Sequence, residues 1–181
     1  MKLGIVIPAY NEEKRIGPTL ETYGSFFEKE RKKGLDYEIL VAINNTKDRT
    51  LAITKESGKK NKRITYIDLP KGGKGYAVIE GFKKLIAKKF DVIGFVDADM
   101  STRPDAFYDL VMNIGSYGGV IASRYLPGAK VSPKNTLPRI IASRIYNFVI
   151  RAMLVIPYRD TQCGAKIFRR EALEACIEDI G

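Results

Sequence analysis

Two carboxylates stand one residue apart at the end of an apolar run. Residues 92–96 are mostly apolar, and Asp97, Ala98 and Asp99 follow them directly. Such a run predicts a buried strand, and ligands of open α/β sheets bind beyond the carboxyl ends of the strands. Paired carboxylates suit Mg²⁺ or Mn²⁺, and Mg²⁺ is held by one or two carboxylates together with substrate phosphates. The pair therefore indicates either a metal-assisted nucleotide site or, as in many acidic loops, two solvated carboxylates.

The chain around this pair alternates strands and helices. Short β-branched runs predict strands, and apolar residues at helical spacing predict the helices between them. We expect strands at 3–7, 37–43, 64–67, 92–96, 120–122 and 166–168, and helices at 18–33, 50–56, 76–88, 104–113 and 170–177. Ser101 or Thr102 is the expected cap of the helix that Pro104 opens. This order predicts an α/β fold, a single domain with a Rossmann-like, mainly parallel sheet and helices on both faces.

The composition narrows the chemistry. The chain has 181 residues, of which 45% are hydrophobic and 29% charged, as in one globular domain. It has no histidine, which excludes histidine bases, His-containing triads and His-ligated zinc. Cys163 and Cys176 are too few for a disulfide scaffold, so a reducing cytoplasm is the simplest setting. A net charge of +10 favours anionic partners, but no aromatic signature accompanies the lysine clusters, so we expect no nucleic-acid partner.

Two further segments each allow two interpretations. The loop 71–75 (Lys-Gly-Gly-Lys-Gly) suits a phosphate but equally an ordinary flexible loop, and it lacks the spacing of a Walker loop. The segment 138–156 is apolar but interrupted by Arg139, Arg144 and Arg151, which argues against a membrane span. It is either a basic amphipathic helix in a membrane interface or a core helix whose arginines reach the solvent.

Five segments, taken in order, resemble glycosyltransferase family 2, whose members are inverting enzymes with a GT-A fold. They are 6–13 (Val-Ile-Pro-Ala-Tyr-Asn-Glu-Glu), 73–75 (Gly-Lys-Gly), 97–99 (Asp-Ala-Asp), 123–125 (Ser-Arg-Tyr) and 160–168 (Asp-Thr-Gln-Cys-Gly-Ala-Lys-Ile-Phe). Within the family, the chain looks like the polyprenyl-phosphate branch, the dolichyl-phosphate glucosyl- and mannosyltransferases. The resemblance covers nearly the whole chain and implies one GT-A catalytic domain over residues 1–181.

The resemblance implies a nucleotide site. Matching positions in the family place Pro8, Tyr10 and Glu12 beside the base and ribose, and add Asn44 and Lys74 to the nucleotide-binding residues. Asp97 would contact the nucleotide sugar.

The resemblance also implies catalytic and acceptor-binding residues. Asp99 would hold Mg²⁺ or Mn²⁺ with Ser101 as a further ligand, and Arg124 would face the diphosphate or the acceptor phosphate. The implied catalytic residues are thus Asp97, Asp99 and Arg124. Three more positions, Arg139, Ser143 and Lys166, match residues that meet the lipid phosphate.

The implied reaction is transfer of a hexose from UDP-glucose or GDP-mannose to a polyprenyl (dolichyl) phosphate. It implies a protein associated peripherally with the cytoplasmic face of a membrane. Two alternatives stay open: a family member with a soluble or protein acceptor, and a non-catalytic module that binds nucleotide sugars.

The chain departs from the family pattern in two places. After the second strand the family usually has Val-Asp-Asp-Gly-Ser-x-Asp-Gly-Thr, whereas residues 42–50 place Ile43 and Asn44 at the paired aspartates. An Asp accepts a hydrogen bond from a base N–H, but an Asn donates or accepts. The identity of the base in the sugar donor therefore stays open, and so does whether the chain keeps full activity. Relatives also continue into a Phe-Asp-x-Glu-type segment and often membrane helices, so we expect a truncated chain or a catalytic core alone.

Overall fold

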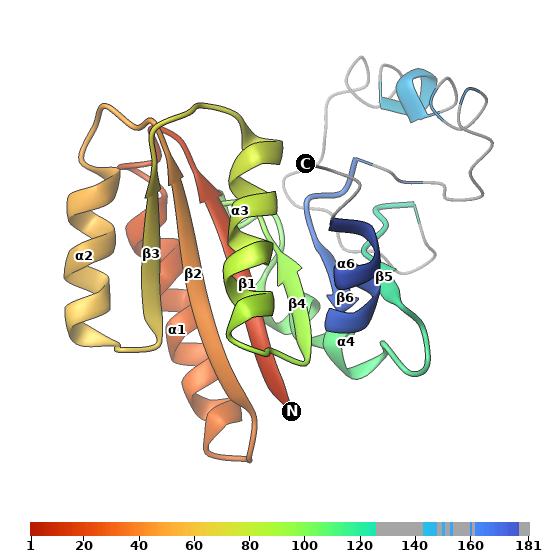
Figure 1. The fold of residues 1–181 in the computed structure, drawn as a ribbon. Coiled ribbons are helices and arrows are strands. Elements are labelled where there is room, and N and C mark those ends of the chain that lie inside the picture. Colours follow the sequence, from red (N-terminus) through yellow and green to blue (C-terminus); the bar gives the residue numbers. More distant parts are fainter. Residues whose placement is uncertain (126–142, 148–149, 151–152, 154–159, 161, 178–181) are drawn as a thin grey trace.

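The fold is described from a computed structural model of the chain (Figure 1). It describes residues 1–125, 143–147, 150, 153, 160 and 162–177, so the predicted lipid-phosphate residue Arg139 lies outside the described residues. The elements are β1 (Lys2–Ala9), α1 (Ile16–Arg31), β2 (Asp36–Asn44), α2 (Thr50–Lys60), β3 (Ile64–Leu69), α3 (Lys74–Ala87), β4 (Val92–Phe95), α4 (Pro104–Met112), β5 (Gly119–Ile121), β6 (Lys166–Arg169) and α6 (Arg170–Ile177).

The described strands form one six-stranded sheet in the order β3-β2-β1-β4-β6-β5. The strands β3, β2, β1 and β4 are parallel, whereas β6 runs antiparallel to both β4 and β5. The expected mainly parallel sheet is confirmed. Because β6 is antiparallel, its first residue, Lys166, pairs with Phe95, the last residue of β4.

The central strands are buried because helices cover both faces of the sheet. Ile5 and Ile7 of β1 pack with α1 and α4 in one apolar cluster. Val6, between them, faces the other cluster, to which α3 and α6 contribute. A Cβ at Gly81 of α3 would lie 2.6 Å from Val6 Cγ1, so only glycine lets this helix approach β1 so closely. Double coverage explains why these strands read as unbroken apolar runs.

The start of α3 and the cap of α4 differ from expectation. α3 begins at Lys74, two residues before the expected start, so the second lysine of the glycine-rich loop belongs to the first turn of a helix. The expected cap of α4 at Ser101 or Thr102 was wrong: Arg103 is the N-cap residue, and no side chain caps the helix. The reason is Pro104 at the start of α4, because a proline holds the preceding residue in an extended conformation.

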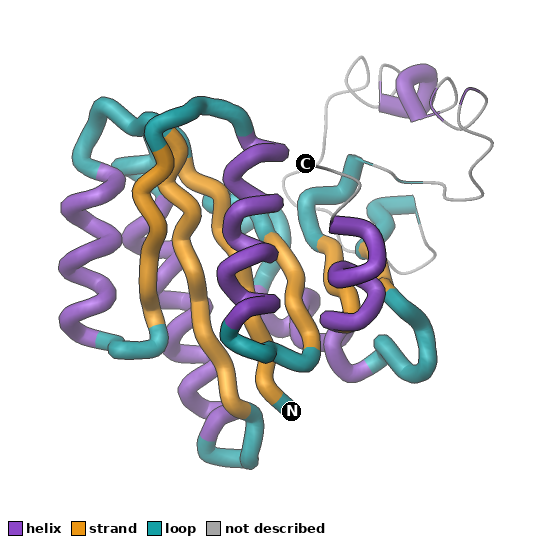
Figure 2. Tube along the Cα trace, viewed as in Figure 1, coloured by secondary structure: helices purple, strands orange, loops and turns teal. Residues whose placement is uncertain are grey.

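The other helices differ from expectation only at their ends. α1 begins at Ile16 rather than Pro18, and Gly34, at a φ of 103°, follows its end. α2 continues to Lys60, beyond the expected end at residue 56. These shifts leave the layers unchanged. The loops that follow β1, β2 and β3 therefore gather at one edge of the sheet (Figure 2).

Candidate active site at the carboxyl edge of the sheet

A cavity of about 320 Å³ opens at the carboxyl ends of β1, β2 and β4. Its lining brings together residues from four separate parts of the chain: Pro8, Tyr10, Glu12, Asn44, Lys74, Asp97, Ala98 and Asp99. Every residue predicted to bind the nucleotide is in this set. A larger cavity, of about 410 Å³, lies between α1 and α2 and contains none of the predicted residues. We take the smaller cavity as the candidate site because it lies where ligands of parallel sheets bind.

The Asp97 carboxylate is held from two sides. Its Oδ1 forms an ion pair with Nζ of Lys74, which stands in the first turn of α3. On its other side, a Cβ at position 164 would lie 2.1 Å from Asp97 Oδ2, so the chain before β6 passes the carboxylate only because Gly164 has no side chain. Asp97 is therefore oriented by a lysine and by a close backbone approach.

Asp99 is exposed and offers a carboxylate suited to a hard cation. Its Oδ1 accepts a hydrogen bond of 2.9 Å from the backbone N–H of Ser101. Burial raises the pKa of Asp99, but the hydrogen bonds from Ser101 outweigh this effect and keep the pKa below its usual value, so Asp99 is ionised at neutral pH. The described residues contain no group of three or more His, Cys, Asp or Glu that could hold a metal. A cation here therefore needs further oxygen ligands, and Mg²⁺ commonly takes these from phosphates and water.

The loops after β1 and β2 are joined by hydrogen bonds around Asp48. Asp48 Oδ1 accepts from the backbone N–H and the hydroxyl of Thr50, and its Oδ2 accepts from the backbone N–H of Glu13. Although burial raises it, these bonds lower the pKa of Asp48 to about 2. Thr50 Oγ1 in turn accepts from the backbone N–H of Glu12, at 2.8 Å. This network fixes the loop that carries Glu12 into the cavity.

Arg124 is held in a two-pronged ion pair with Asp160. Its Nε and Nη2 each lie 2.9 Å from a carboxylate oxygen of Asp160, and its backbone N–H donates to the same carboxylate, also at 2.9 Å. Asp160 is 1% exposed, whereas 31% of the Arg124 side chain is exposed. Burial raises the pKa of Asp160, but the bonds from Arg124 prevail and hold it below its usual value. Arg124 was predicted to face a phosphate, and the structure shows that two of its donors face Asp160.

The structure places Lys166 and Ser143, the two described residues predicted to meet the lipid phosphate, in different elements. Lys166 lies at the start of β6, where its Nζ donates to the backbone carbonyl of Cys163 and stands 5.2 Å from the centre of the Phe95 ring. Burial lowers the pKa of Lys166, and the charge of Lys74 lowers it further, whereas Asp97 raises it. Ser143, by contrast, lies in the helical residues 143–147, where its Oγ is 2.7 Å from the hydroxyl of Tyr125.

Two site residues had no role in the sequence reasoning. Asp160 and Gly164 both lie in the segment 160–168 that carries the resemblance, but nothing in their types identifies Arg124 or Asp97 as partners. These contacts join residues 36 and 67 positions apart in sequence (160 − 124; 164 − 97), and only the antiparallel placement of β6 brings the segment to this edge.

Comparison with known proteins matches nearly the whole chain to one family. A family model described as glycosyl transferase family 2 matches residues 4–177. The chain is 33% identical over 177 residues to the dolichyl-phosphate beta-glucosyltransferase ALG5C of Trichomonas vaginalis, covering 92% of this chain and 51% of that protein. It is 30% identical over 187 residues to glycosyltransferase AglD of Haloferax volcanii, covering 99% of this chain and 28% of that protein. The chain thus spans about half the length of the first relative, and less of the second.

Solved structures share the fold at lower identity. The mannosyltransferase PcManGT from Pyrobaculum calidifontis, in complex with GDP-Man and Mn²⁺, matches with a TM-score of 0.59 at 18% identity, covering 96% of this chain and 46% of that one. The glucosyl-3-phosphoglycerate synthase from Mycobacterium tuberculosis, with Mn²⁺ and UDP, gives a TM-score of 0.63 at 20% identity, covering 94% and 57%. These matches confirm the expected GT-A fold, and with the family match over residues 4–177 they establish that this chain belongs to glycosyl transferase family 2.

Proposed function

We propose that the chain transfers a hexose from a nucleotide-diphosphate sugar to a polyprenyl phosphate, with inversion at the anomeric carbon. The observation that carries this proposal is the cavity at the carboxyl edge of the sheet. Seven of its eight lining residues match family positions that meet the nucleotide, the sugar or the metal, and Ala98 is the eighth. The names of its relatives among the dolichyl-phosphate beta-glucosyltransferases support glucose and a dolichyl-type acceptor.

The cavity offers a suitable group to each part of the donor. Tyr10, which is 53% exposed, presents a ring on which a base can stack, and Asn44 presents an amide to its edge. The first turn of α3 supplies Lys74 and the positive end of a helix dipole, and both favour a diphosphate. Asp97, beside Lys74, accepts hydrogen bonds from the hydroxyls of the sugar.

A divalent cation fits the donor set at Asp99. Asp99 would hold Mg²⁺ or Mn²⁺, with Ser101 beside it, and the donor phosphates would complete the ligands. Such an ion supplies Lewis-acid stabilisation of the charge that develops on the leaving diphosphate. In the solved relatives, Mn²⁺ accompanies GDP-Man in one case and UDP in another.

The chemical step needs no histidine. An oxygen of the acceptor phosphate forms a bond to the anomeric carbon, and the bond from that carbon to the diphosphate oxygen breaks, so that the nucleoside diphosphate leaves with the electron pair. A phosphate monoester has a second pKa of about 6, so the nucleophile is already an anion at neutral pH. The protein then has to hold two anions close together, and Lys74, Lys166 and Arg124 are the cations of the described region that border the reacting groups.

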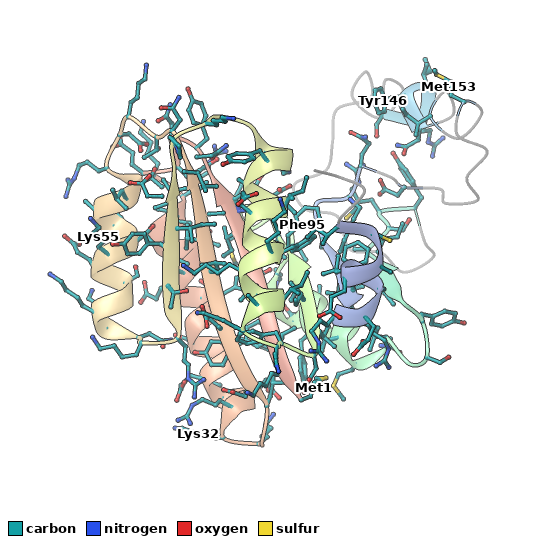
Figure 3. The ribbon with its side chains drawn as sticks, viewed as in Figure 1. Met1, Lys32, Lys55, Phe95, Tyr146 and Met153 are labelled. Carbon is teal, nitrogen blue, oxygen red and sulfur yellow. The ribbon has the colours of Figure 1, made fainter. Side chains whose placement is uncertain are left out.

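The acceptor side of the proposal rests on the segment after β5. Among its described residues Arg144, Ile145, Tyr146 and Met153 are exposed, with 59% of Ile145, 50% of Tyr146 and 73% of Met153 in contact with solvent. Figure 3 shows Tyr146 and Met153 apart from the sheet. Exposed apolar side chains next to an arginine suit a membrane interface with anionic headgroups. No helix among the described residues is long and apolar enough to cross a bilayer.

We therefore also propose that the protein acts at the cytoplasmic face of a membrane, where Ser143 and Arg139 meet the lipid phosphate. A transfer assay tests the whole proposal. The purified chain is incubated with radiolabelled UDP-glucose or GDP-mannose, a short-chain polyprenyl phosphate and Mn²⁺, and the lipid phase is counted. We expect label in the lipid phase only with metal and with both substrates.

The assay distinguishes the alternatives. Transfer to 3-phosphoglycerate, a soluble acceptor of the kind named in one solved relative, without transfer to lipid would replace the polyprenyl acceptor. Donor binding without transfer to either acceptor would indicate a binding module. The matched control is Asp109→Ala, which removes an exposed carboxylate of α4 outside the cavity and should leave transfer unchanged.

A further inference from the structure

The turn that carries Asp99 contains a backbone conformation that needs support. Met100, directly after Asp99, has a φ of 60°, in the left-handed region that an L side chain adopts only at a cost in free energy. Such conformations persist where surrounding contacts hold them, and they gather at functional sites. Oδ1 of Asp99 accepts from the backbone N–H of Ser101 across this turn. The contacts that hold the turn therefore also determine where the Asp99 carboxylate lies.

Two buried hydroxyl groups of α1 bond to backbone carbonyls on either side of this turn. Thr19 is 1% exposed, and its Oγ1 lies 2.8 Å from the carbonyl oxygen of Ala98. Tyr23 is fully buried, and its hydroxyl donates to the carbonyl of Thr102 at 2.7 Å. The two side chains stand one helical turn apart on α1 and so share one face of it. Together their bonds bracket residues 99–101.

Both hydroxyl groups act as donors to the turn. Thr19 Oγ1 also lies 2.9 Å from the carbonyl oxygen of Arg15, one turn earlier in the chain. A hydroxyl has a single proton, and the Arg15 carbonyl already accepts the backbone N–H of Thr19 at 3.2 Å, so the proton goes to Ala98. Burial raises the pKa of Tyr23, and the charges of two nearby aspartates raise it further, so its phenol stays protonated.

We propose that Thr19 and Tyr23 are positioning residues for the divalent cation, because their hydroxyl groups fix the turn that presents Asp99. The inference rests on the proposed function and deepens it. The carbonyl of Ala98 belongs to the peptide group that joins Ala98 to Asp99, so the bond from Thr19 fixes the direction in which Asp99 leaves the backbone. Groups that hold metal ligands in place typically contribute about 10–100-fold to metal affinity.

The start of α1 links the same helix to the nucleotide side of the cavity. The carbonyl of Glu12 accepts the backbone N–H groups of Arg15 and Ile16, at 2.9 and 2.8 Å, so α1 starts directly from the loop that carries Glu12. One helix therefore holds both the loop that borders the nucleotide and the turn that presents Asp99.

Direct measurement of Mn²⁺ binding tests the inference. The electron paramagnetic resonance signal of free Mn²⁺, followed while the full chain is titrated at saturating UDP, gives the Kd of the cation without any transfer reaction. We expect Thr19→Val, which replaces the hydroxyl with a methyl group, and Tyr23→Phe each to raise this Kd by about tenfold. Thr19→Ser keeps the donor, so its Kd should stay close to that of the wild type.

Thr54 and Tyr37 provide matched controls. Thr54 is 1% exposed, and its hydroxyl donates at 2.9 Å to the carbonyl of Thr50, one turn earlier in α2. Tyr37 is fully buried, and its hydroxyl accepts from the side chain of Asn61 at 2.9 Å. Thr54→Val and Tyr37→Phe therefore remove the same buried groups from contacts outside residues 97–102. Denaturant unfolding should show losses of stability in these controls as well, but their Mn²⁺ Kd should not change.

The outcomes separate the inference from the proposed function. If the wild type binds Mn²⁺ but Tyr23→Phe and Thr19→Val bind it equally well, the positioning role is overturned and the metal-dependent transferase stays in place. Equal weakening in Thr19→Ser or in the two controls overturns the role in the same way. Should Thr19→Val fail to fold, Tyr23→Phe decides alone. If the wild type binds no Mn²⁺ with either UDP or GDP, the inference and the metal-dependent reaction are overturned together.

Discussion

Replacing Arg124 with alanine tests whether its main task is to compensate a buried charge. The change removes two of the three hydrogen bonds that Arg124 donates to the Asp160 carboxylate: the two side-chain bonds of 2.9 Å are lost, and the backbone bond stays. Breaking a buried ion pair by removing one partner costs about 3–5 kcal/mol. Because 31% of the Arg124 side chain is in solvent, we take the lower end, about 3 kcal/mol. In a domain of this size that lowers Tm by about 6–12 °C.

The dependence of the unfolding free energy on pH below 7 tests the same prediction in a second way. In the wild type the pKa of Asp160 is depressed, so the stability that the pair contributes is present above the ordinary aspartate pKa and is lost as the pH falls. In Arg124→Ala, the side-chain hydrogen bonds no longer oppose the effect of burial, which therefore raises the pKa of Asp160. Acidification then protonates the buried carboxylate and removes the destabilisation that its unpaired charge causes in the variant. The difference in unfolding free energy between the two proteins should therefore shrink as the pH falls from 7 towards about 4.

Denaturant unfolding and thermal scans from pH 4 to pH 7 measure both effects. The matched control is Arg103→Ala, which breaks an ion pair with Asp105 in which 77% and 59% of the side chains are exposed. Such surface pairs contribute at most about 1 kcal/mol. Equal losses in the two variants, or a loss in Arg124→Ala that does not depend on pH, would refute the reasoning. Loss of transfer without loss of stability would show that Arg124 acts on the substrates instead.

Three further perturbations address the site. Asp99→Asn should remove the Mn²⁺-dependent stabilisation by UDP, which for the wild type at a hundredfold excess over Kd is about 2.7 kcal/mol, and a thermal-shift series with and without Mn²⁺ shows it. Gly164→Ala forces a methyl group to within 2.1 Å of Asp97 Oδ2, so we expect the free energy of unfolding to fall by about 1–3 kcal/mol and donor binding to weaken. The control Gly72→Ala, where a Cβ would have no atom within 4 Å, should change neither quantity. Equal behaviour of the two variants would contradict the close approach. In the wild type, the depressed pKa of Asp48 adds stability that is lost as the pH falls from 3.8 to about 2. In Asp48→Asn, the free energy of unfolding should therefore depend less on pH across this range, and an unchanged dependence would disprove the assignment.

The sequence predicts the parts of this molecule that local pattern determines. The buried strands show as apolar runs because both faces of the sheet are covered, and the acidic pair shows because Asp97 and Asp99 directly follow such a run. The residues that the family resemblance predicts to bind the nucleotide all line one cavity, and their role in binding stays a prediction.

The remaining features depend on tertiary contacts that no local pattern encodes. The partner of Arg124 is 36 residues away (160 − 124), and the need for glycine at position 164 arises only from the neighbouring Asp97 carboxylate. The start of α3 was placed two residues late because helix signals in a glycine-rich loop are weak, although this shift puts Lys74 on the helix. The expected cap of α4 failed because Pro104 makes the preceding residue the N-cap.

The most direct measurement is a crystal of the chain soaked with Mn²⁺ and UDP-glucose, with data collected at the manganese absorption edge. The account predicts one anomalous peak about 2 Å from an oxygen of Asp99, with the diphosphate beside Lys74 and the base between Tyr10 and Asn44. An anomalous peak away from Asp99, or a nucleotide bound outside the cavity at the carboxyl edge, would contradict it.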